Sequence, residues 1–323
     1  MTGRKGRAAA EPDTTVDRVI AALDKWPDGM HDLGEPRVDV PLDWPPPVVD
    51  VYLALDGGRL FGDSLSLVAS ADAPAWDGDR LALVDWLAES ISVDRAGKVW
   101  RADPETGEEV CDGTSFDRWL HGAIDATALL FDTDGEFREE VFTDEGELTP
   151  AVALAMAKAQ VRRDPRAPGP RWRLARLLTE RGDLDTARAE LEEVVAHAPH
   201  QAWAWLDLAR LSERLGSPAG AVDEAEAAAD ADPAHEQRAH FLAEAARLAV
   251  LAEDEARRAA LAGRALAIAP GLVASQLAGA DDQLTEGDLA AAAHLAALAR
   301  ALAPRDLAVI DLCRRIDAAR AAN

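Results

Sequence analysis

Cysteine, asparagine and tyrosine are scarce in this chain of 323 residues, which holds two, one and one of them. The two cysteines, Cys111 and Cys313, are too few for a disulfide framework or a thiolate metal site. We therefore expect reduced thiols in a cytoplasmic protein. No apolar run reaches the roughly 18 residues that span a bilayer, and the basic first residues lead into acidic ones without an apolar segment. The sequence thus predicts neither a membrane protein nor a secretory signal.

Lysine and arginine are fewer than aspartate and glutamate, and the difference is larger in the first half of the chain than in the second. The chain has 34 Lys and Arg against 59 Asp and Glu, a net charge of −25. Residues 1–148 hold 13 against 33, or −20, and residues 149–323 hold 21 against 26, or −5. Such an acidic first half repels nucleic acid and anionic lipid and favours encounter with basic proteins. The alternative is a solvated surface that only keeps the protein soluble.

Signatures of catalysis and of metal binding are missing. The segment Asp132–Gly135 resembles part of a calcium loop, but the alignment puts Leu130 and Val141 at ligand positions. The one close histidine pair, His197 and His200, has no third ligand nearby for zinc. No Gly-x-Ser-x-Gly elbow and no phosphate loop occur. The sequence therefore predicts no enzyme, no cofactor and no metal.

Regularly spaced prolines mark an internal repeat in the second half. Pro165, Pro199 and Pro233 are 34 residues apart, Pro270 follows after 37, and Pro304 after 34 again. A fixed period of this length is typical of repeat proteins built from helix pairs. Because proline ends a helix and stacked pairs bury their faces against neighbours, we expect a solenoid.

One unit shows how the repeat is built. A first helix around Trp172 ends at Gly182, which accepts the left-handed backbone of a helix C-terminus. Asp183 begins a second helix, and Pro199 ends it. The small Ala175 lets the two helices approach closely.

These spacings resemble the tetratricopeptide repeat, and the resemblance covers residues 149–323. It implies about four helix-turn-helix repeats with a C-terminal cap helix at 306–322, and a degenerate first repeat whose second helix is 150–163. The unit between Pro233 and Pro270 has three extra residues and Glu253 in place of the turn glycine. We expect a lengthened turn or helix there.

In this family the first helix of each unit lines a concave groove for peptides or helices of partners. The matching positions are Trp172, Arg173, Arg176, Asp207, Arg210, Arg214, Gln237, His240, Glu244 and Arg247. Residues 151–182 carry eight basic side chains against two acidic ones, or +6. They serve either to grip an acidic partner segment, to dock on the chain's own acidic first half, or only as a solvated face. The carboxylate clamp of chaperone-binding members is disfavoured, because it needs asparagines beside its basic residues.

Residues 1–148 lack the repeat and predict an α+β domain. Helices are expected at 14–26, 48–55 and 115–130, a strand at 65–68, and a hairpin of 90–93 with 98–101. The stretch from Pro45 through Gly57-Gly58 to Leu60-Phe61-Gly62, and the later Ser115–Leu120, resemble the SUKH superfamily over about 42–142. The residues that carry this likeness are Pro47, Tyr52, Gly57, Gly58, Gly62, Phe116 and Trp119. The resemblance implies a fold for protein recognition without catalysis.

Taken together, the sequence predicts a non-catalytic adaptor that binds protein partners through the groove and the SUKH-like domain. An immunity protein that neutralises a basic toxin, such as a nuclease, is the alternative, because many bacterial members of the superfamily act in this way. An enzyme hidden in the first half is the third hypothesis. No nucleic acid, membrane or cofactor is expected as a partner.

Overall fold

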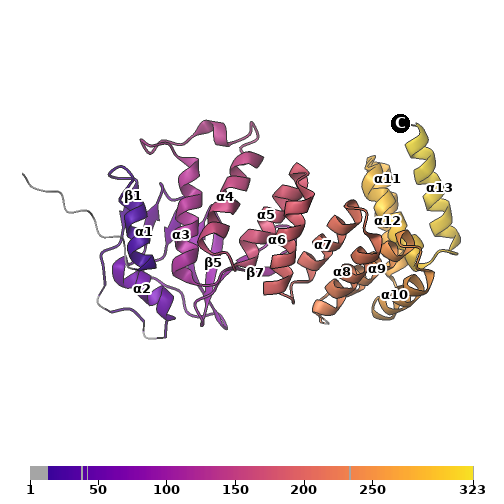
Figure 1. Cartoon of the computed structure of the whole chain (residues 1–323), viewed down its shortest axis with the longest axis horizontal. Coiled ribbons are helices and arrows are strands. Elements are labelled where there is room, and N and C mark those ends of the chain that lie inside the picture. Colours follow the sequence, from indigo (N-terminus) through magenta and orange to yellow (C-terminus); the bar gives the residue numbers. More distant parts are fainter. Residues whose placement is uncertain (1–13, 38, 42, 233, 323) are drawn as a thin grey trace, which may run out of the picture. The chain divides into compact units, whose positions relative to one another are not determined.

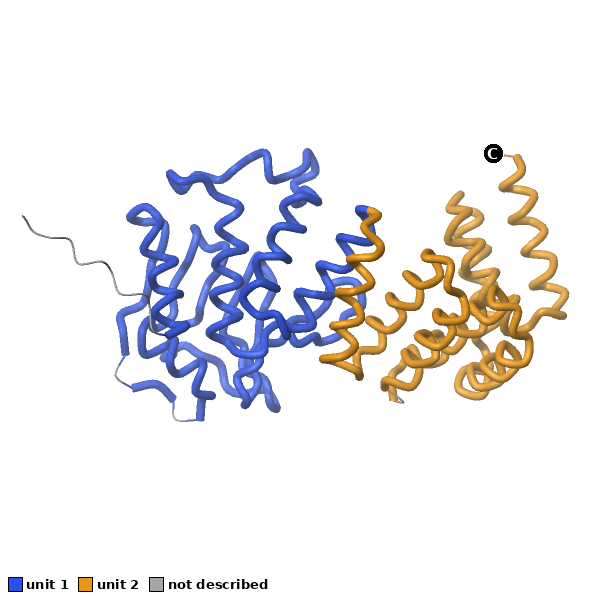
Figure 2. The backbone as a smooth tube through the Cα atoms, in the orientation of Figure 1, with its two compact units in different colours: residues 1–181 blue, residues 182–323 orange. Residues whose placement is uncertain are grey.

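The computed structural model describes residues 14–37, 39–41, 43–232 and 234–322. The chain divides into two compact units, Met1–Arg181 and Gly182–Asn323 (Figure 2). The sequence predicted the change of fold at 148/149, whereas the contacts group the next two helices with the sheet. No single helix among the described residues is long and apolar enough to cross a membrane; a pair bent by 94°, Glu255–Ile268 with Leu272–Glu286, passes that test together.

In its described residues, unit 1 is a seven-stranded antiparallel sheet with five helices (Figure 1). The strands pair in sequence order as a meander: β1 His31–Leu33, β2 Gly58–Leu60, β3 Leu65–Leu67, β4 Arg80–Trp86, β5 Glu89–Asp94, β6 Val99–Ala102 and β7 Glu109–Gly113. The helices are α1 Thr15–Leu23, α2 Pro46–Ala54, α3 Phe116–Thr127, α4 Pro150–Arg163 and α5 Pro168–Arg181, with short 3₁₀ helices at Ala128–Leu130 and Glu139–Val141. The predicted helices, strand and hairpin of this half are all present.

Local chemistry explains where these elements begin. Thr14 caps α1 by accepting a hydrogen bond from the amide of Asp17, whose carboxylate accepts one from the Thr14 amide in return. Helix α2 starts directly after Pro45 with prolines in its first turn, where the missing N–H costs nothing. The strand pair β4–β5 places Trp86 opposite Glu89 and leaves only Leu87 and Ala88 in the turn.

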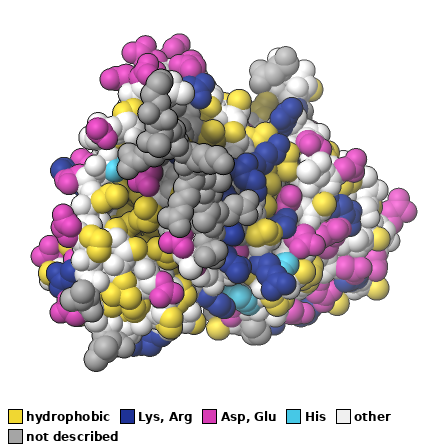
Figure 3. All heavy atoms as spheres, turned by 60° about the vertical axis from the view of Figure 1, so that its left-hand side comes forward, with side chains coloured by type: hydrophobic (Ala, Val, Ile, Leu, Met, Phe, Trp, Pro, Cys, Tyr) yellow, Lys and Arg dark blue, Asp and Glu magenta, His cyan; other side chains and the backbone are white. Residues whose placement is uncertain are grey.

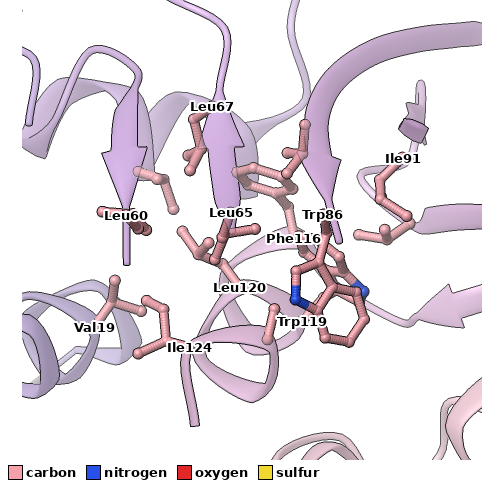
Figure 4. Packing of buried hydrophobic residues seen from close by; sticks show 14 of the residues in the cluster. Val19, Leu60, Leu65, Leu67, Trp86, Ile91, Phe116, Trp119, Leu120 and Ile124 are labelled. Atoms are coloured by element: carbon pink, nitrogen blue, oxygen red, sulfur yellow. The ribbon is translucent and has the colours of Figure 1, made fainter. Parts of the chain in front are cut away.

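The core of unit 1 is built from the sheet and from α1, α2, α3 and α4. Trp86 from β4 meets Trp119 from α3 edge to face, with ring centroids 5.9 Å apart (Figure 4). Phe116 stacks on Trp119 at 6.2 Å, and Met156 of α4 belongs to the same cluster. Such aromatic pairs add about 0.5–1.5 kcal/mol each beyond their buried area. Helix α4 is therefore part of the same core as the sheet.

Unit 2 is an all-helical array in which consecutive helices pack against each other, except that Glu255–Ile268 and Leu272–Glu286, bent by 94°, make little contact. Its helices are α6 Leu184–His197, α7 Ala202–Arg214, α8 Pro218–Ala231, α9 Arg238–Leu251, α10 Glu255–Ile268, α11 Leu272–Glu286, α12 Leu289–Leu302 and α13 Leu307–Ala322. Alanines from facing helices fill the interface, among them Ala221, Ala225 and Ala246, all fully buried. Small side chains let the helix axes come close, as the sequence predicted.

The irregular unit keeps the backbone of the others. Gly216 and Gly287 end their helices at φ of +78° and +88°, and Glu253 takes the same left-handed conformation at +58°. The residue with the left-handed backbone follows the preceding proline by 17 residues in the regular units and by 20 residues in the irregular one. The three extra residues therefore precede the turn: the link before α9 is longer and the two helices keep their register. Pro233 itself lies outside the described residues.

Candidate functional site

The first predicted groove helix, α5, packs on the last strand of the sheet, β7. A Cβ on Gly169 would lie 2.6 Å from Asp112 Oδ1, so only glycine allows this approach. Arg173 of α5 donates from Nη1 to that oxygen at 2.6 Å and from Nη2 to Gln160 Oε1 at 3.2 Å. The Asp112 side chain is fully buried and also accepts from Trp119 Nε1 at 2.8 Å. Arg173 thus ties a repeat helix to the sheet.

Three other basic residues of α4 and α5 bind carboxylates of the acidic first half in the same way. Arg176 Nη1 lies 2.8 Å from Asp103 Oδ2 and 3.3 Å from Glu105 Oε2. Arg163 and Arg162 reach Asp125 Oδ2 at 2.6 and 3.1 Å. Of the predicted uses of the basic stretch, the structure shows intramolecular docking.

Burial and charge act against each other at the Asp112–Arg173 pair. Burial raises the pKa of Asp112, but the Arg173 and Arg101 guanidiniums hold it below the usual carboxyl value overall. Burial lowers the pKa of Arg173, and the Asp112 carboxylate opposes that shift. Two charges taken out of water repay that cost only when both remain paired.

The groove prediction is corrected at two positions. Trp172 is 1% exposed, with the Arg176 guanidinium 4.1 Å above its ring. Glu244 of α9 is fully buried. Neither side chain can reach a partner, because the large indole is needed in the core and the carboxylate is enclosed by cations.

In unit 2, Glu244 is the centre of an ionic cluster that we call the Glu244 cluster. Its members are Asp207, Arg210, Glu213, His240, Glu244, Arg247 and His294. His294 Nε2 of α12 lies 2.8 Å from Glu244 Oε1, and Arg247 Nε donates to Oε2 at 2.9 Å. Arg247 also binds Glu213 of α7 through both Nη atoms, at 2.8 and 2.6 Å. The cluster thereby joins α7, α9 and α12.

The charges of the cluster hold each other in place. Burial opposes ionisation of Glu244, yet His294 and Arg247 keep its pKa far below the usual range. The pKa of Arg247 is raised by Glu213 and Glu244 against the effect of burial. Burial lowers the pKa of His240, which lies 3.8 Å from Glu244 Oε1. A buried carboxylate with several cationic partners is a rigid support rather than a mobile contact.

The remaining predicted groove residues differ in how much of them solvent can reach. Arg210 is 43% exposed, and its contacts to Asp207 and Glu244, 3.5 and 3.7 Å, are long for ion pairs. Arg214 and Gln237 are exposed as well. Acidic and basic side chains lie interspersed over the surface shown in Figure 3. Arg210, Arg214 and Gln237 are therefore predicted groove residues whose side chains are accessible to an outside contact.

The residues of the SUKH resemblance have structural roles. Tyr52 and Phe116 are fully buried and Trp119 is 2% exposed; the Tyr52 hydroxyl donates to the Val68 carbonyl at 2.8 Å. Gly57, Gly58 and Gly62 take positive φ in the turns around β2. Pro47 lies in the first turn of α2. The contacts of these positions are those of residues that build the fold.

Sequence reasoning missed the acidic partners of the predicted residues. Asp103 and Asp112 carry no pattern that sets them apart from the other carboxylates of the first half, and His294 lies 50 residues from Glu244. The 34-residue spacing of Glu213 and Arg247 was the one available signal. Within the described residues no group of three or more His, Cys, Asp or Glu side chains is placed to hold a metal ion.

Comparison with known proteins supports the repeat half. Residues 178–245 match the tetratricopeptide repeat family. No curated protein sequence matches the chain. The helical half is a tetratricopeptide-type array, and such repeats generally mediate protein–protein interactions. None of the comparisons supports the SUKH resemblance, which stays a prediction.

Several solved structures have a similar helical arrangement over about half of this chain. MamA is 12% identical, with 54% of this chain and 90% of that chain covered at a TM-score of 0.37. A thermophilic TPR protein of Thermus thermophilus is 22% identical, with 53% and 91% covered at 0.34. PilW, a type IV pilus biogenesis factor, is 17% identical, with 53% and 79% covered at 0.36. TM-scores of this size carry no functional argument.

Proposed function

We propose that this protein is a non-catalytic adaptor that binds partner proteins through the first helices of its repeats. The family match over residues 178–245 supports this class of function. The observation that carries the proposal is the Arg210 side chain, which is 43% exposed and lies 3.7 Å from the buried carboxylate of Glu244. A charged group fixed on a rigid helix loses little entropy on binding.

The partner segment that fits Arg210 carries a carboxylate. Arg210 lies 3.5 Å from a carboxylate oxygen of Asp207 and 3.7 Å from one of Glu244. Because both contacts are long, a carboxylate of a partner can form a shorter, bidentate ion pair with Arg210. Trp203 lies on the same helix, α7, partly exposed and edge-on to Phe241 at 5.1 Å. An acidic residue beside an apolar one would therefore suit this surface.

Affinity capture with the full chain tests the proposal. Bait proteins carrying Arg210→Glu and Arg300→Glu are compared with the unchanged chain at low and high salt. Arg300 is an exposed arginine on α12 and serves as the matched charge reversal. We expect Arg210→Glu to weaken partner capture at least tenfold and Arg300→Glu to leave it unchanged. Equal capture by all three baits would refute the assignment of Arg210.

The acidic first half favours a second candidate, an immunity protein that masks a basic toxin. Residues 1–148 keep a charge of −20, and α4 and α5 neutralise only a few of these carboxylates. Co-expression of the full chain with effector proteins encoded beside its gene is the direct trial. Relief of toxicity by one of them would support immunity, and no relief from any of them would remove it.

A further inference from the structure

Unit 1 contains a cavity of about 260 Å³ between the sheet and the two repeat helices packed on it. It lies at the β4–β5 turn and the end of β6, and α4 and α5 close its other side. Most of its wall is apolar, with Trp86, Leu87, Leu148, Met156 and Leu177. At roughly 30 Å³ per water, the volume admits a group of about the size of one or two side chains.

Arg101 lines this cavity, and part of its guanidinium has no hydrogen-bond acceptor among the described residues. The Arg101 side chain is 13% exposed, with Nε paired to Glu89 and the guanidinium 5.2 Å from the centre of the Trp86 ring. Its two Nη atoms donate to no residue in the described part of the chain, and they are not buried. Arg173 and Arg176, which also line the cavity, bind Asp112 and Asp103. Arg101 therefore presents two free N–H groups beside an apolar wall.

The turn that brings Leu87 to the cavity wall is strained. Leu87 and Ala88 have φ of +51° and +66°, and neither is a glycine or an asparagine. Two-residue hairpins with this backbone favour Asn-Gly. A leucine held in a left-handed conformation costs about 1–2 kcal/mol and is most often kept for a functional reason. Here it adds an apolar side chain to the cavity wall.

Two carboxylates limit the charge of a ligand. Glu105 and Glu180 line the same cavity and are exposed. Like charges held close together disfavour each other. A ligand with one carboxylate can bind Arg101, whereas a second carboxylate would meet these acidic side chains.

We propose that this cavity, the Arg101 pocket, binds a monocarboxylate carried on an apolar group. The carboxylate accepts one hydrogen bond from each Nη atom of Arg101 as a bidentate pair, and the apolar group packs against Trp86, Leu87 and Met156. The same chemistry is offered by a small free acid and by the C-terminus of a peptide that ends in an apolar residue. This site lies wholly within unit 1 and shares helix α5 with the predicted groove, but it does not include Arg210, on which the proposed function rests.

Isothermal titration of the full chain with three probes tests the pocket. 3-Phenylpropionate represents the free acid, N-acetyl-leucine the peptide C-terminus, and N-acetyl-leucinamide the same body without the charge. We expect at least one of the two acids to bind. If N-acetyl-leucine binds, N-acetyl-leucinamide should bind at least tenfold more weakly. A stronger signal from one acid identifies the source. No heat from either acid at millimolar concentration would overturn the proposal.

Variants separate the pocket from general stability. Arg101→Gln should weaken the acid at least tenfold, whereas Arg95→Gln, which removes a guanidinium 4.2 Å above Trp76 outside the cavity, should leave binding unchanged. Leu87→Asn places a residue suited to the turn and removes apolar wall, so thermal stability should hold or rise while affinity falls severalfold. Ala153→Phe fills the cavity and should abolish binding. Unchanged affinity in Arg101→Gln refutes the site.

Discussion

The same repeat positions have different partners in the two units. Arg176, Arg210 and Arg247 occupy one position of successive repeats, spaced by 34 and 37 residues. In unit 1, Arg176 binds Asp103 of the sheet domain. In unit 2, Arg247 binds Glu213 and Glu244 of neighbouring repeat helices, and Arg210 keeps 43% of its side chain exposed.

The neighbouring position shows the same contrast. Arg173 of α5 corresponds to Asp207 of α7 and Glu244 of α9. Arg173 forms an ion pair with the buried Asp112 of β7. Glu244, at the equivalent position of α9, forms an ion pair with Arg247 of the same helix. Helix α5 is therefore fastened to the sheet within unit 1, whereas Glu244 of α9 is paired within unit 2.

Removal of Arg173 should have the largest effect. Arg173→Ala leaves the buried Asp112 carboxylate without its hydrogen-bonded cation, which costs about 3–5 kcal/mol in buried pairs. Urea unfolding followed by circular dichroism measures the loss. Arg95→Ala, an exposed arginine stacked on Trp76, is the control and should cost under about 1 kcal/mol. Equal losses in the two variants would contradict the fastening role.

The equivalent change in unit 2 should be milder. Arg247→Ala leaves Glu244 with His294 at 2.8 Å and leaves Glu213 partly exposed to water. We expect a loss of about 1–3 kcal/mol, the range for hydrogen bonds to charged groups. The same unfolding experiment measures it. A loss as large as that of Arg173→Ala would erase the difference between the two units.

Acid should weaken the Glu244 cluster. The folded pKa of Glu244 is lowered, so its contribution is complete above the unfolded value of about 4.3 and is lost as pH falls below it. Glu244→Gln removes this titration. The difference in unfolding free energy between wild type and variant should shrink by about 1–2 kcal/mol from pH 7 to pH 3. A difference that stays constant with pH would show that Glu244 is not ionised in the folded protein.

The turn of the irregular repeat should give the smallest effect. Glu253→Gly relieves a left-handed backbone that glycine adopts freely, offset by the greater freedom of glycine in the unfolded chain. We expect a gain of up to about 1 kcal/mol, seen as a higher melting temperature. Gly216→Glu at the regular turn is the reciprocal control and should lower it. A destabilised Glu253→Gly would mean that the glutamate side chain has a role of its own.

Much of the fold could be predicted because it depends on local rules. Proline and glycine spacing placed the helix ends, and the predicted helix 150–163 matches α4 residue for residue. The hairpin of β5 and β6 followed from a short turn between β-branched segments. Such signals act within a few residues, where backbone sterics and capping dominate.

The candidate site was less predictable. The family position placed Arg173 and Arg176 in an open groove, but their carboxylates lie 61 and 73 residues away in the chain. No spacing encodes such a pair. The Arg101 pocket likewise gathers residues from β4, β6, α4 and α5.

The sequence by itself determined the helix pairs, their period and the acidic character of the first half, because proline, glycine and charge act through local geometry and composition. Only the tertiary structure decided which arginines form ion pairs with buried carboxylates and which remain exposed to solvent. Burial makes that choice: a carboxylate enclosed by the fold, such as Asp112 or Glu244, requires a cation beside it. Arg210, at the edge of its cluster, is left with much of its guanidinium in water.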